Sequence, residues 1–356
     1  MLYAALLALA LALAPTPGPP PPSPGHGRGE PHARDVAAAK HRGMSYAHGF
    51  RRGERVGYDT PHSLRSLARL AELGVDWVSI TPFGFMSGPH GTSITWGRRG
   101  IAESDEALRQ ATADAHAQGL RVMLKPHIWL RPPEWPGTVA PLDEPGWKEW
   151  FQSYRAFIVH YAEVARRTGA DAFCVGTELE KTTPRAAPWL DIIAAVRQAY
   201  PGPLTYAANP QEVHAVGFWD RLDVIGVNGY YPLSESRTPT VPQLISAWSQ
   251  EKERLGALSA RWKRKVVFTE LGYRSADFGA WKHWEIKDGA PVNLAAQANA
   301  YEAFFETVWP EPWCGGVYWW KWFSFRGHSG PTSNDFELEN KPAEKVVERY
   351  YRKRGR

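Results

Sequence analysis

The sequence predicts a single (β/α)8 barrel, and three observations lead to this prediction. Short apolar segments alternate with longer amphipathic segments along the chain from about residue 36. The apolar segments are nearly continuous, which is typical of parallel strands that are covered on both faces. Eight such strand–helix units can be counted, and eight is the number that closes this kind of barrel. The length of 356 residues is sufficient for one large barrel or for two ordinary domains.

The segment that precedes the barrel differs from it in composition. Residues 1–14 are apolar and rich in Leu and Ala, which predicts a signal peptide or an N-terminal anchor. No Lys or Arg precedes this run, and Pro15 follows it at a position where proline would block cleavage. Residues 15–35 are rich in Pro and Gly and predict a disordered linker. We therefore expect the barrel, residues 36–356, to be secreted or periplasmic, with a membrane tether if the leader is uncleaved; a disordered cytoplasmic leader is the alternative.

The strands are predicted where residues of high strand propensity are concentrated. Several of these segments end in polar residues or in Gly and Pro, which turn the chain away from the sheet. The predicted strands cover residues 43–47, 77–83, 121–127, 172–178, 204–209, 224–228, 266–270 and 316–322.

The helices between the strands are predicted from their caps and their apolar faces. In the first of them, Thr60-Pro61 supplies an N-cap and a first-turn proline, apolar residues recur at helical spacing, and Gly74 ends the helix. Another helix is expected to open at Thr183-Pro184. The first helix covers residues 63–73, and the remaining predicted helices cover residues 104–118, 145–167, 242–262, 294–308 and 342–352.

An open, doubly wound sheet is the alternative to the barrel. That fold normally carries a glycine-rich phosphate-binding turn directly after its first strand. The first strand here contains Gly43-Met44-Ser45-Tyr46, which is not such a turn. The barrel is therefore the favoured fold.

The overall charge does not indicate a nucleic-acid partner. The formal charge is +5, and much of the excess lies in the basic tail at residues 349–356, which we interpret as a solvated chain end. Cys174 and Cys314 fall in or before strands, where buried free thiols are usual, and no Cys/His pair has the spacing of metal ligands. We therefore expect a monomer without a metal or cofactor.

Aromatic residues are unusually frequent. They make up 13% of the chain and include 17 Trp, more than packing of the core alone would need. Aromatic rings in this number suit stacking on the flat faces of sugar rings. An oligosaccharide or polysaccharide is therefore the expected partner.

Two glutamates stand at the ends of two apolar strands. One strand runs from Val266 into Glu270, and another runs from Ala172 into Glu178. A carboxylate at the tip of a buried strand is costly unless a partner or a function keeps it there, and a structural salt bridge is the plain alternative. Two carboxylates on separate strand ends are what the hydrolysis of a glycosidic bond requires.

The carboxyl ends of barrel strands form the rim of the active site, so polar and aromatic residues at those ends are candidate substrate contacts. Acids, amides and aromatics that converge on one rim are not needed for packing. The candidate substrate-binding residues are Tyr46, His127, Trp129, Thr177, Asn209, Asn228, Tyr230, Tyr231, Trp320 and Trp322.

Three strand-end motifs are Gly-Thr-Glu-Leu at 176–179, Phe-Thr-Glu-Leu-Gly-Tyr at 268–273 and Val-Tyr-Trp-Trp-Lys-Trp at 317–322. They resemble glycoside hydrolase family 113, whose characterised members act on β-1,4-mannan, within the retaining glycosidases of clan A. The resemblance implies Glu178 as acid/base, Glu270 as nucleophile, and a hydrogen bond from Tyr230 to the nucleophile. It also suggests that a tryptophan of the last strand forms the floor of the sugar site. Most members of the wider clan have asparagine at the position of Thr177. The resemblance therefore does not imply how the 2-hydroxyl of the sugar is bound.

A second acid, Glu180, lies two residues beyond Glu178 and on a strand would face the same side. Glu178 directly ends the apolar run, where desolvation would raise its pKa, so we take it as the acid/base and Glu180 as a rim residue. We expect the carboxyl groups of Glu178 and Glu270 to lie about 5 Å apart, the spacing of a retaining, double-displacement enzyme.

Three other functions remain open at this point. One is a carbohydrate-binding barrel without catalysis, and another is a glycosidase that acts on a different β-glycan. The third is a phosphate-dependent barrel enzyme such as an aldolase or isomerase. That enzyme would need an anion site near the last strands, for which Gly327-His328-Ser329-Gly330 is a weak candidate.

Overall fold

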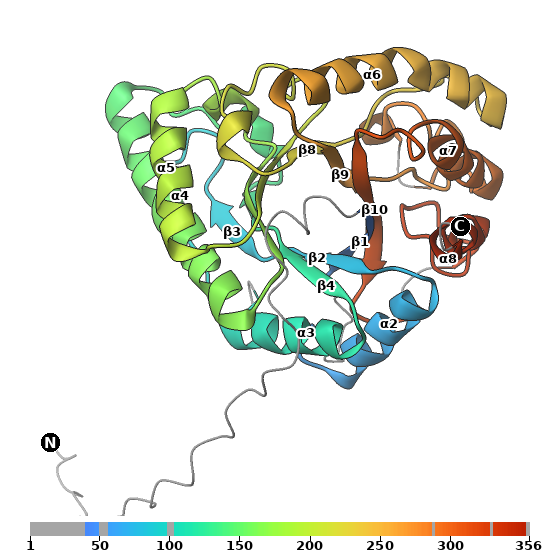
Figure 1. Cartoon of the computed structure of the whole chain (residues 1–356), viewed down its shortest axis with the longest axis horizontal. Helices are drawn as coiled ribbons and strands as arrows, with labels where there is room; N and C mark the ends of the chain where they lie inside the picture. Colours follow the sequence, from blue (N-terminus) through green and yellow to red (C-terminus); the bar gives the residue numbers. More distant parts are fainter. Residues whose placement is uncertain (1–39, 50–55, 98–102, 287–288, 328–329, 354–356) are drawn as a thin grey trace, which may run out of the picture. The chain divides into compact units, whose positions relative to one another are not determined.

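The computed structural model describes residues 40–49, 56–97, 103–286, 289–327 and 330–353. Eight parallel strands close into one barrel, which Figure 1 shows surrounded by helices. The predicted (β/α)8 fold is therefore confirmed. Around the barrel the strands follow the order β1 (His41–Ala47), β2 (Trp77–Ile80), β4 (Arg121–Leu124), β6 (Ala172–Thr177), β7 (Leu204–Ala208), β8 (Ile225–Asn228), β9 (Val266–Leu271) and β10 (Cys314–Phe323), which pairs with β1.

The helices cover the outside of the barrel. Most of them begin or end within a few residues of the predicted bounds, because their caps are readable in the sequence; Thr60, for example, accepts a hydrogen bond from the backbone N–H of Ser63. The helices are α2 (Pro61–Glu72), α3 (Asp105–Ala117), α4 (Glu144–Thr168), α5 (Ala186–Ala199), α6 (Val241–Trp262), α7 (Leu294–Thr307) and α8 (Pro342–Arg352).

The helix expected to open at Thr183-Pro184 begins later, at Ala186. The hydroxyls of Thr182 and Thr183 donate to the carbonyls of Leu179 and Glu180 and so close the preceding turn. They are therefore not available as N-caps, and the prediction is wrong by a few residues.

Two predicted strands, residues 77–83 and 121–127, are each divided in two. After β2 and β4 the chain continues into β3 (Phe83–Met86) and β5 (His127–Leu130), which pair with each other in a separate two-stranded parallel sheet. Ile80 is in register with Leu124, so Pro82 and Pro126 interrupt both strands at the same level. Proline has no N–H to donate, which ends the barrel ladder there.

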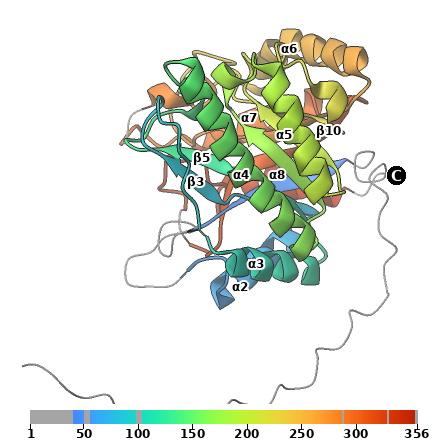
Figure 2. The same ribbon diagram turned by 90° about the vertical axis from the view of Figure 1, so that its left-hand side faces the viewer.

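This two-stranded sheet extends the wall of the barrel beyond the carboxyl ends of β2 and β4. It packs against α4, because an added Cβ at Gly84 would meet the ring of Phe157 at 2.7 Å. Figure 2 shows β3 and β5 beside this helix. The sheet thereby provides one side of the opening above the barrel.

Many of the tryptophans are buried in the core, although the excess of aromatic residues was predicted to bind sugar. Their rings pack between the barrel and the helices, which reduces the number left for sugar contacts. The fully buried ones are Trp77, Trp150, Trp189, Trp219, Trp248, Trp319 and Trp322. Three others, Trp129, Trp135 and Trp284, are between 43% and 56% exposed.

Several predictions concern parts of the chain that the structure leaves out. The signal or anchor segment and the linker, residues 1–35, lie outside the described residues, as do His328 and Ser329 of the weak anion-site candidate. Within the described part of the chain, no helix is long and apolar enough to cross a membrane. Cys174 and Cys314 are both buried and free.

Candidate active site

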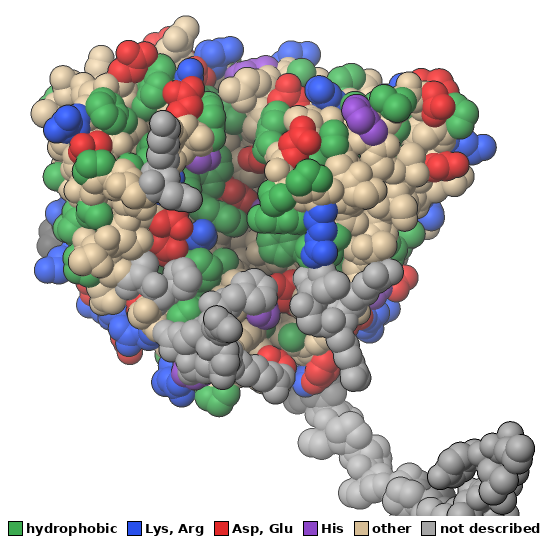
Figure 3. Space-filling model, turned by 180° about the vertical axis from the view of Figure 1, so that it is seen from behind, with side chains coloured by type: hydrophobic (Ala, Val, Ile, Leu, Met, Phe, Trp, Pro, Cys, Tyr) green, Lys and Arg blue, Asp and Glu red, His purple; other side chains and the backbone are tan. Residues whose placement is uncertain are grey.

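A cleft of about 430 Å³ opens at the carboxyl ends of the barrel strands. Glu178 and Glu270 both line it. In Figure 3 one face of the molecule is hollowed near its centre, with acidic side chains in the hollow and hydrophobic side chains around it. The other lining residues are Phe83, His127, Ile128, Trp129, Pro133, Glu134, Trp135, Pro136, Thr177, Asn228 and Trp320.

Glu178 is directed into the cleft by the way β6 ends. The strand stops at Thr177, and Glu178 adopts a left-handed backbone conformation with φ of 53°. Such a conformation is strained for a residue with a side chain and has to be held by its surroundings. Its N–H donates to the carbonyl of Ala207 at 2.8 Å, and the next N–H, that of Leu179, donates to the hydroxyl of Tyr206 at 2.8 Å.

Two side chains donate hydrogen bonds to the Glu178 carboxylate. The indole N–H of Trp135 reaches Oε2 at 2.7 Å, and the amide of Asn228 reaches Oε1 at 2.9 Å. Burial raises the pKa of Glu178, and the charge of Glu270 raises it further, while these two donors oppose the shift. The net increase favours a protonated carboxyl group that is able to act as an acid.

The amide of Asn228 is oriented by its neighbour. The hydroxyl of Thr269 donates to Asn228 Oδ1 at 3.0 Å, which directs Nδ2 toward Glu178. Thr269 precedes Glu270 on β9, so the positions of the two glutamates are linked through adjacent strands.

Glu270 is held by a buried cation and a tyrosine. The ammonium of Lys125, which has no exposed surface, forms an ion pair with Oε1 of Glu270 and donates to the carbonyl of Thr269 at 3.2 Å. The hydroxyl of Tyr230 donates to Oε2 at 2.9 Å. The two contacts engage both oxygens of the carboxylate and fix the position of the Glu270 side chain.

His127 lies between Glu270 and the aromatic wall of the cleft. Its Nε2 is 3.5 Å from Glu270 Oε1, and its ring is stacked on that of Trp320 with the centroids 6.3 Å apart. Burial lowers the pKa of His127 well below its usual range, and the charge of Lys125 adds to this effect. His127 is therefore neutral at pH 7 and able to exchange hydrogen bonds with a sugar hydroxyl.

The structure brings together in the cleft most of the residues that the strand ends predicted. His127, Trp129, Thr177, Asn228 and Trp320 all line it. Tyr230 contacts it through the bond to Glu270. Trp129 is 46% exposed and edge-on to the ring of Phe83, which leaves indole surface available to a ligand.

Three predicted substrate contacts face away from the cleft and are corrected here. Tyr46 is fully buried and its hydroxyl bonds to Ser63 of α2, while the indole N–H of Trp322 donates to Ser66 of the same helix at 2.8 Å. Tyr231 is buried against Trp248 of α6. Side chains at strand ends alternate between the inside and the outside, and these three point outward into the helical layer.

Asn209 is also corrected, because it organises a loop instead of lining the cleft. Its Oδ1 accepts from the N–H groups of Gln211 and Glu212, and its amide donates to Glu180 at 2.9 Å. Glu180 is likewise not among the cleft residues. Of the two acids Glu178 and Glu180, Glu178 lines the cleft and Glu180 does not.

Two functional contacts were missed at the sequence level, those of Lys125 and Trp135. Lys125 ends an apolar strand just before Pro126. A charged residue at the end of a buried strand needs a partner, so the sequence did indicate a polar contact there. Trp135 lies in the loop 132–136, where no periodicity indicates which way a side chain points. Among the described residues, no three His, Cys, Asp or Glu side chains are grouped as metal ligands.

The fold and the cleft together define a class of protein. A parallel eight-stranded barrel carries one glutamate at the end of its fourth strand, β6, with a raised pKa. It carries a second on its seventh strand, β9, that is ion-paired and hydrogen-bonded. Two carboxyl groups with such different surroundings, in one cleft lined by aromatic rings, fit the requirements of a glycoside hydrolase.

The family follows from comparison with known proteins. The model of Glycoside Hydrolase Family 113 matches residues 44–341, and the chain belongs to this family. The resemblance that the strand-end motifs indicated is thereby confirmed. A comparison with functionally curated proteins gives no match.

Solved structures agree with the family assignment. The GH113 β-mannanase AaManA from Alicyclobacillus acidocaldarius, in complex with ManMIm, is 31% identical, with a TM-score of 0.79 over 89% of this chain and 98% of that one. A GH113 β-1,4-mannanase, solved as a complex, is 27% identical, with a TM-score of 0.78 over 89% and 100%. A β-glucuronidase from Ruminococcus gnavus is 14% identical, with a TM-score of 0.59 over 88% of this chain and 49% of that one, and shares the fold alone.

Proposed function

We propose that this glycoside hydrolase cleaves β-1,4-linked mannan or manno-oligosaccharides with retention, by double displacement. The observation that carries the proposal is the contrast between its two glutamates. Burial and a neighbouring charge favour the protonated form of Glu178, whereas Lys125 and Tyr230 bind the carboxylate of Glu270. The similarity to two β-mannanases over almost their entire length supports the choice of sugar.

In the first step the Glu178 proton moves to the glycosidic oxygen while Glu270 attacks the anomeric carbon. The bond to the leaving sugar breaks, and a covalent glycosyl–enzyme ester forms at Glu270. In the second step Glu178, now a carboxylate, takes a proton from a water molecule that attacks the same carbon. Glu270 then leaves as a carboxylate, and the ion pair with Lys125 is restored.

The aromatic residues of the cleft bind the sugar chain. Trp320 lines the cleft with its ring parallel to that of His127, and Trp129 and Trp135 line it with exposed rings. The C–H faces of a pyranose pack against such rings, and the neutral His127 and Asn228 offer hydrogen-bonding groups at their edges.

Product analysis with purified enzyme tests this function. Proton NMR should show that the first anomer released from manno-oligosaccharides keeps the β configuration. Glu270→Ala should abolish hydrolysis of every substrate, and Glu178→Ala should cost most on substrates with poor leaving groups, because an activated aryl glycoside departs without protonation. Glu253→Ala, at an exposed position on α6, is the control and should retain wild-type activity.

Three results would count against the proposal. Initial release of the inverted anomer would place a water between the two acids and remove Glu270 as nucleophile. Cleavage of glucomannan, cellulose, xylan or chitin oligomers in preference to mannan would change the sugar. Binding of one of these glycans without cleavage would indicate a carbohydrate-binding barrel.

We further propose that the barrel is exported from the cytoplasm. The support is the apolar run at residues 1–14 followed by the Pro-rich spacer at 15–35. Cell fractionation should find the protein outside the cytoplasm or attached to a membrane. Recovery of the full-length chain in the cytosol would contradict export.

A further inference from the structure

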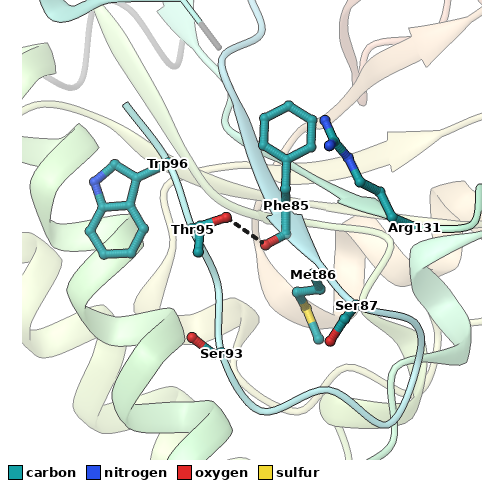
Figure 4. Close-up of a pocket in the computed structure, with 7 residues that line it drawn as sticks. All are labelled: Phe85, Met86, Ser87, Ser93, Thr95, Trp96 and Arg131. Carbon is teal, nitrogen blue, oxygen red and sulfur yellow. Dashed lines mark hydrogen bonds between the residues drawn. The ribbon is translucent and has the colours of Figure 1, made fainter. Parts of the chain in front are cut away.

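A second cavity of about 290 Å³ lies outside the catalytic cleft. Figure 4 shows it beside β3, with the ring of Phe85 and the side chain of Arg131 pointing the same way and Trp96 across the strand from them. Ser87, Ser93 and Thr95 supply hydroxyl groups to its lining. Neither glutamate of the cleft borders it, so the mechanism described above does not use it.

This cavity lies further along the two-stranded sheet than the cleft does. Side chains two residues apart on a strand share a face, so Phe85 follows Phe83 on β3 and Arg131 follows Trp129 beyond β5. Phe83 and Trp129 line the cleft, whereas Phe85 and Arg131 line the second cavity. Two residues of strand advance about 7 Å, which is comparable with one sugar unit of a chain.

The surfaces in this cavity suit a sugar ring. The guanidinium of Arg131 lies 4.4 Å from the centroid of the Phe85 ring, and Arg131 is exposed. Within the described residues no acidic side chain is paired with Arg131, so its five N–H donors are available. Phe85 and Trp96 are both partly exposed, and the Trp96 ring is supported by Phe157 at 5.7 Å.

The position of Arg131 argues for a ligand at this place. An arginine fixed over an aromatic ring loses little further freedom when it donates to a bound hydroxyl. Aromatic surface with a few polar groups at its edge is the usual composition of a site for a small polar ring. The adjoining wall of the cleft shows the same combination, with Phe83 and Trp129 beside His127.

We propose that the Phe85–Arg131 cavity is a distal subsite that binds a further unit of the same β-linked hexose chain whose cleavage occurs in the cleft. This proposal rests on the proposed function, because it assigns the cavity to the same substrate. A chain long enough to leave the cleft along β3 and β5 gains contacts with Phe85, Trp96 and Arg131. A short oligosaccharide ends before it reaches them.

Dependence of the rate on chain length tests the subsite. Arg131→Met keeps the apolar stem over Phe85 and removes the donors, and Phe85→Ala removes the ring. Each should lower kcat/KM on mannohexaose and linear mannan by about tenfold, mainly through KM, and leave kcat/KM on an aryl β-mannobioside unchanged. Arg121→Met is the matched control, because Arg121 also lies over an aromatic ring, that of Trp77 at 5.6 Å, but on the amino-terminal side of β4.

The outcomes separate this subsite from the function of the cleft. In one outcome the wild type hydrolyses mannan, and every variant keeps the wild-type ratio of kcat/KM on long substrates to kcat/KM on the aryl β-mannobioside. That result would refute the subsite and leave the function intact. An equal loss on long and short substrates would also refute it, since it would mean a distorted cleft. If the wild type cleaves no mannan, calorimetry with mannan, glucan, xylan and chitin hexasaccharides decides. Weaker binding of one of them to Arg131→Met, and not to Arg121→Met, would support the subsite; equal binding, or none to the wild type, would refute it.

Discussion

Lys125 is a lysine with no exposed surface in the centre of a barrel. A buried ammonium is tolerated only where an opposite charge and hydrogen bonds replace its hydration. Here the carboxylate of Glu270 and the carbonyl of Thr269 do so. Each charge of the pair therefore stabilises the other, and the side chain of Glu270, the proposed nucleophile, is fixed in place before substrate arrives.

Lys125→Met should damage both stability and catalysis. It leaves Glu270 buried without its cation, and breaking such a pair costs about 3 kcal/mol. We expect urea unfolding to show this loss and kcat/KM to fall by about a hundredfold on all mannosides.

The control for Lys125→Met is Lys252→Met. Lys252 pairs with Glu311 at 3.0 Å, but both side chains are about a third exposed. Because water screens such a pair, its loss should cost less than about 1 kcal/mol and leave kcat/KM unchanged. A Lys125→Met enzyme as active as this control would show that the cation is dispensable.

Trp135 affects the protonation of the acid through one hydrogen bond. Its N–H donates to Glu178 Oε2 and thereby favours the ionised form, which opposes the rise in the pKa of Glu178. Trp135→Phe keeps an aromatic ring and removes the donor, so the pKa of Glu178 should rise further. Glu178 has to be protonated to act, so the alkaline limb of the kcat/KM profile should move to higher pH.

Trp129→Phe serves as the control for that profile. Trp129 lines the same cleft and is similarly exposed, but it makes no hydrogen bond to Glu178. Its replacement should change KM and leave the alkaline limb where it is. If the pH profile of Trp135→Phe coincides with that of the wild type, the hydrogen bond from Trp135 does not affect the protonation of Glu178.

At the scale of elements, the turn after β6 is braced by the loop after β7. The hydroxyl of Tyr206 accepts from the N–H of Leu179 and donates to Glu212 at 2.6 Å, and Asn209 connects the same loop to Glu180. Glu178 needs this support, since its left-handed backbone is strained. Glu178, the proposed acid, is thus positioned by two neighbouring strands and the polar contacts between their loops.

Glu212 makes the stability of this brace depend on pH. Burial raises the pKa of Glu212 from 4.5 to about 8. Between these values the unfolded chain releases the proton and the folded protein keeps it, so stability falls as pH rises through this window. Glu212→Gln cannot ionise, and its unfolding free energy relative to the wild type should increase by roughly 2 to 4 kcal/mol from pH 5 to pH 8.

Urea unfolding at both pH values measures this difference. Glu253→Gln, at an exposed position on α6, is the control and should show the same stability difference from the wild type at pH 5 and at pH 8. If the Glu212→Gln difference is also independent of pH, Glu212 is not the titrating group.

At the scale of the whole molecule, closure of the barrel depends on its first strand. β1 pairs with both β2 and β10, so the first and last strands of the barrel meet in one ladder. The barrel hydrogen bonds start at His41. A chain that begins at residue 40 contains every strand of the barrel.

Deletion of residues 1–39 should therefore leave the melting temperature and kcat/KM unchanged. Deletion of residues 1–47 removes β1 and exposes the edges of β2 and β10, so that chain should fail to fold cooperatively. Circular dichroism melting and activity on mannan compare the two. A lower melting temperature after the shorter deletion would mean that the first 39 residues stabilise the barrel.

The sequence by itself determined the fold class, most of the helices and the two glutamates. These features have local causes: continuous apolar runs require strands buried on both faces, and caps and prolines fix where helices begin. Glu178 and Glu270 were readable because an acid at the end of an apolar strand stands out from its neighbours. The family motifs added the expectation that Tyr230 would meet Glu270, and its hydroxyl lies 2.9 Å away.

The tertiary structure decided which side chains share the cleft. Tyr46, Tyr231 and Trp322 turned out to face the helices, because the direction of a side chain near a strand end depends on the tilt and closure of the whole barrel. Trp135 reaches Glu178 from a loop distant in sequence, and Lys125 reaches Glu270 across the barrel interior. Contacts between residues far apart in the chain have no periodic signal, so they become visible only when the strands are placed side by side.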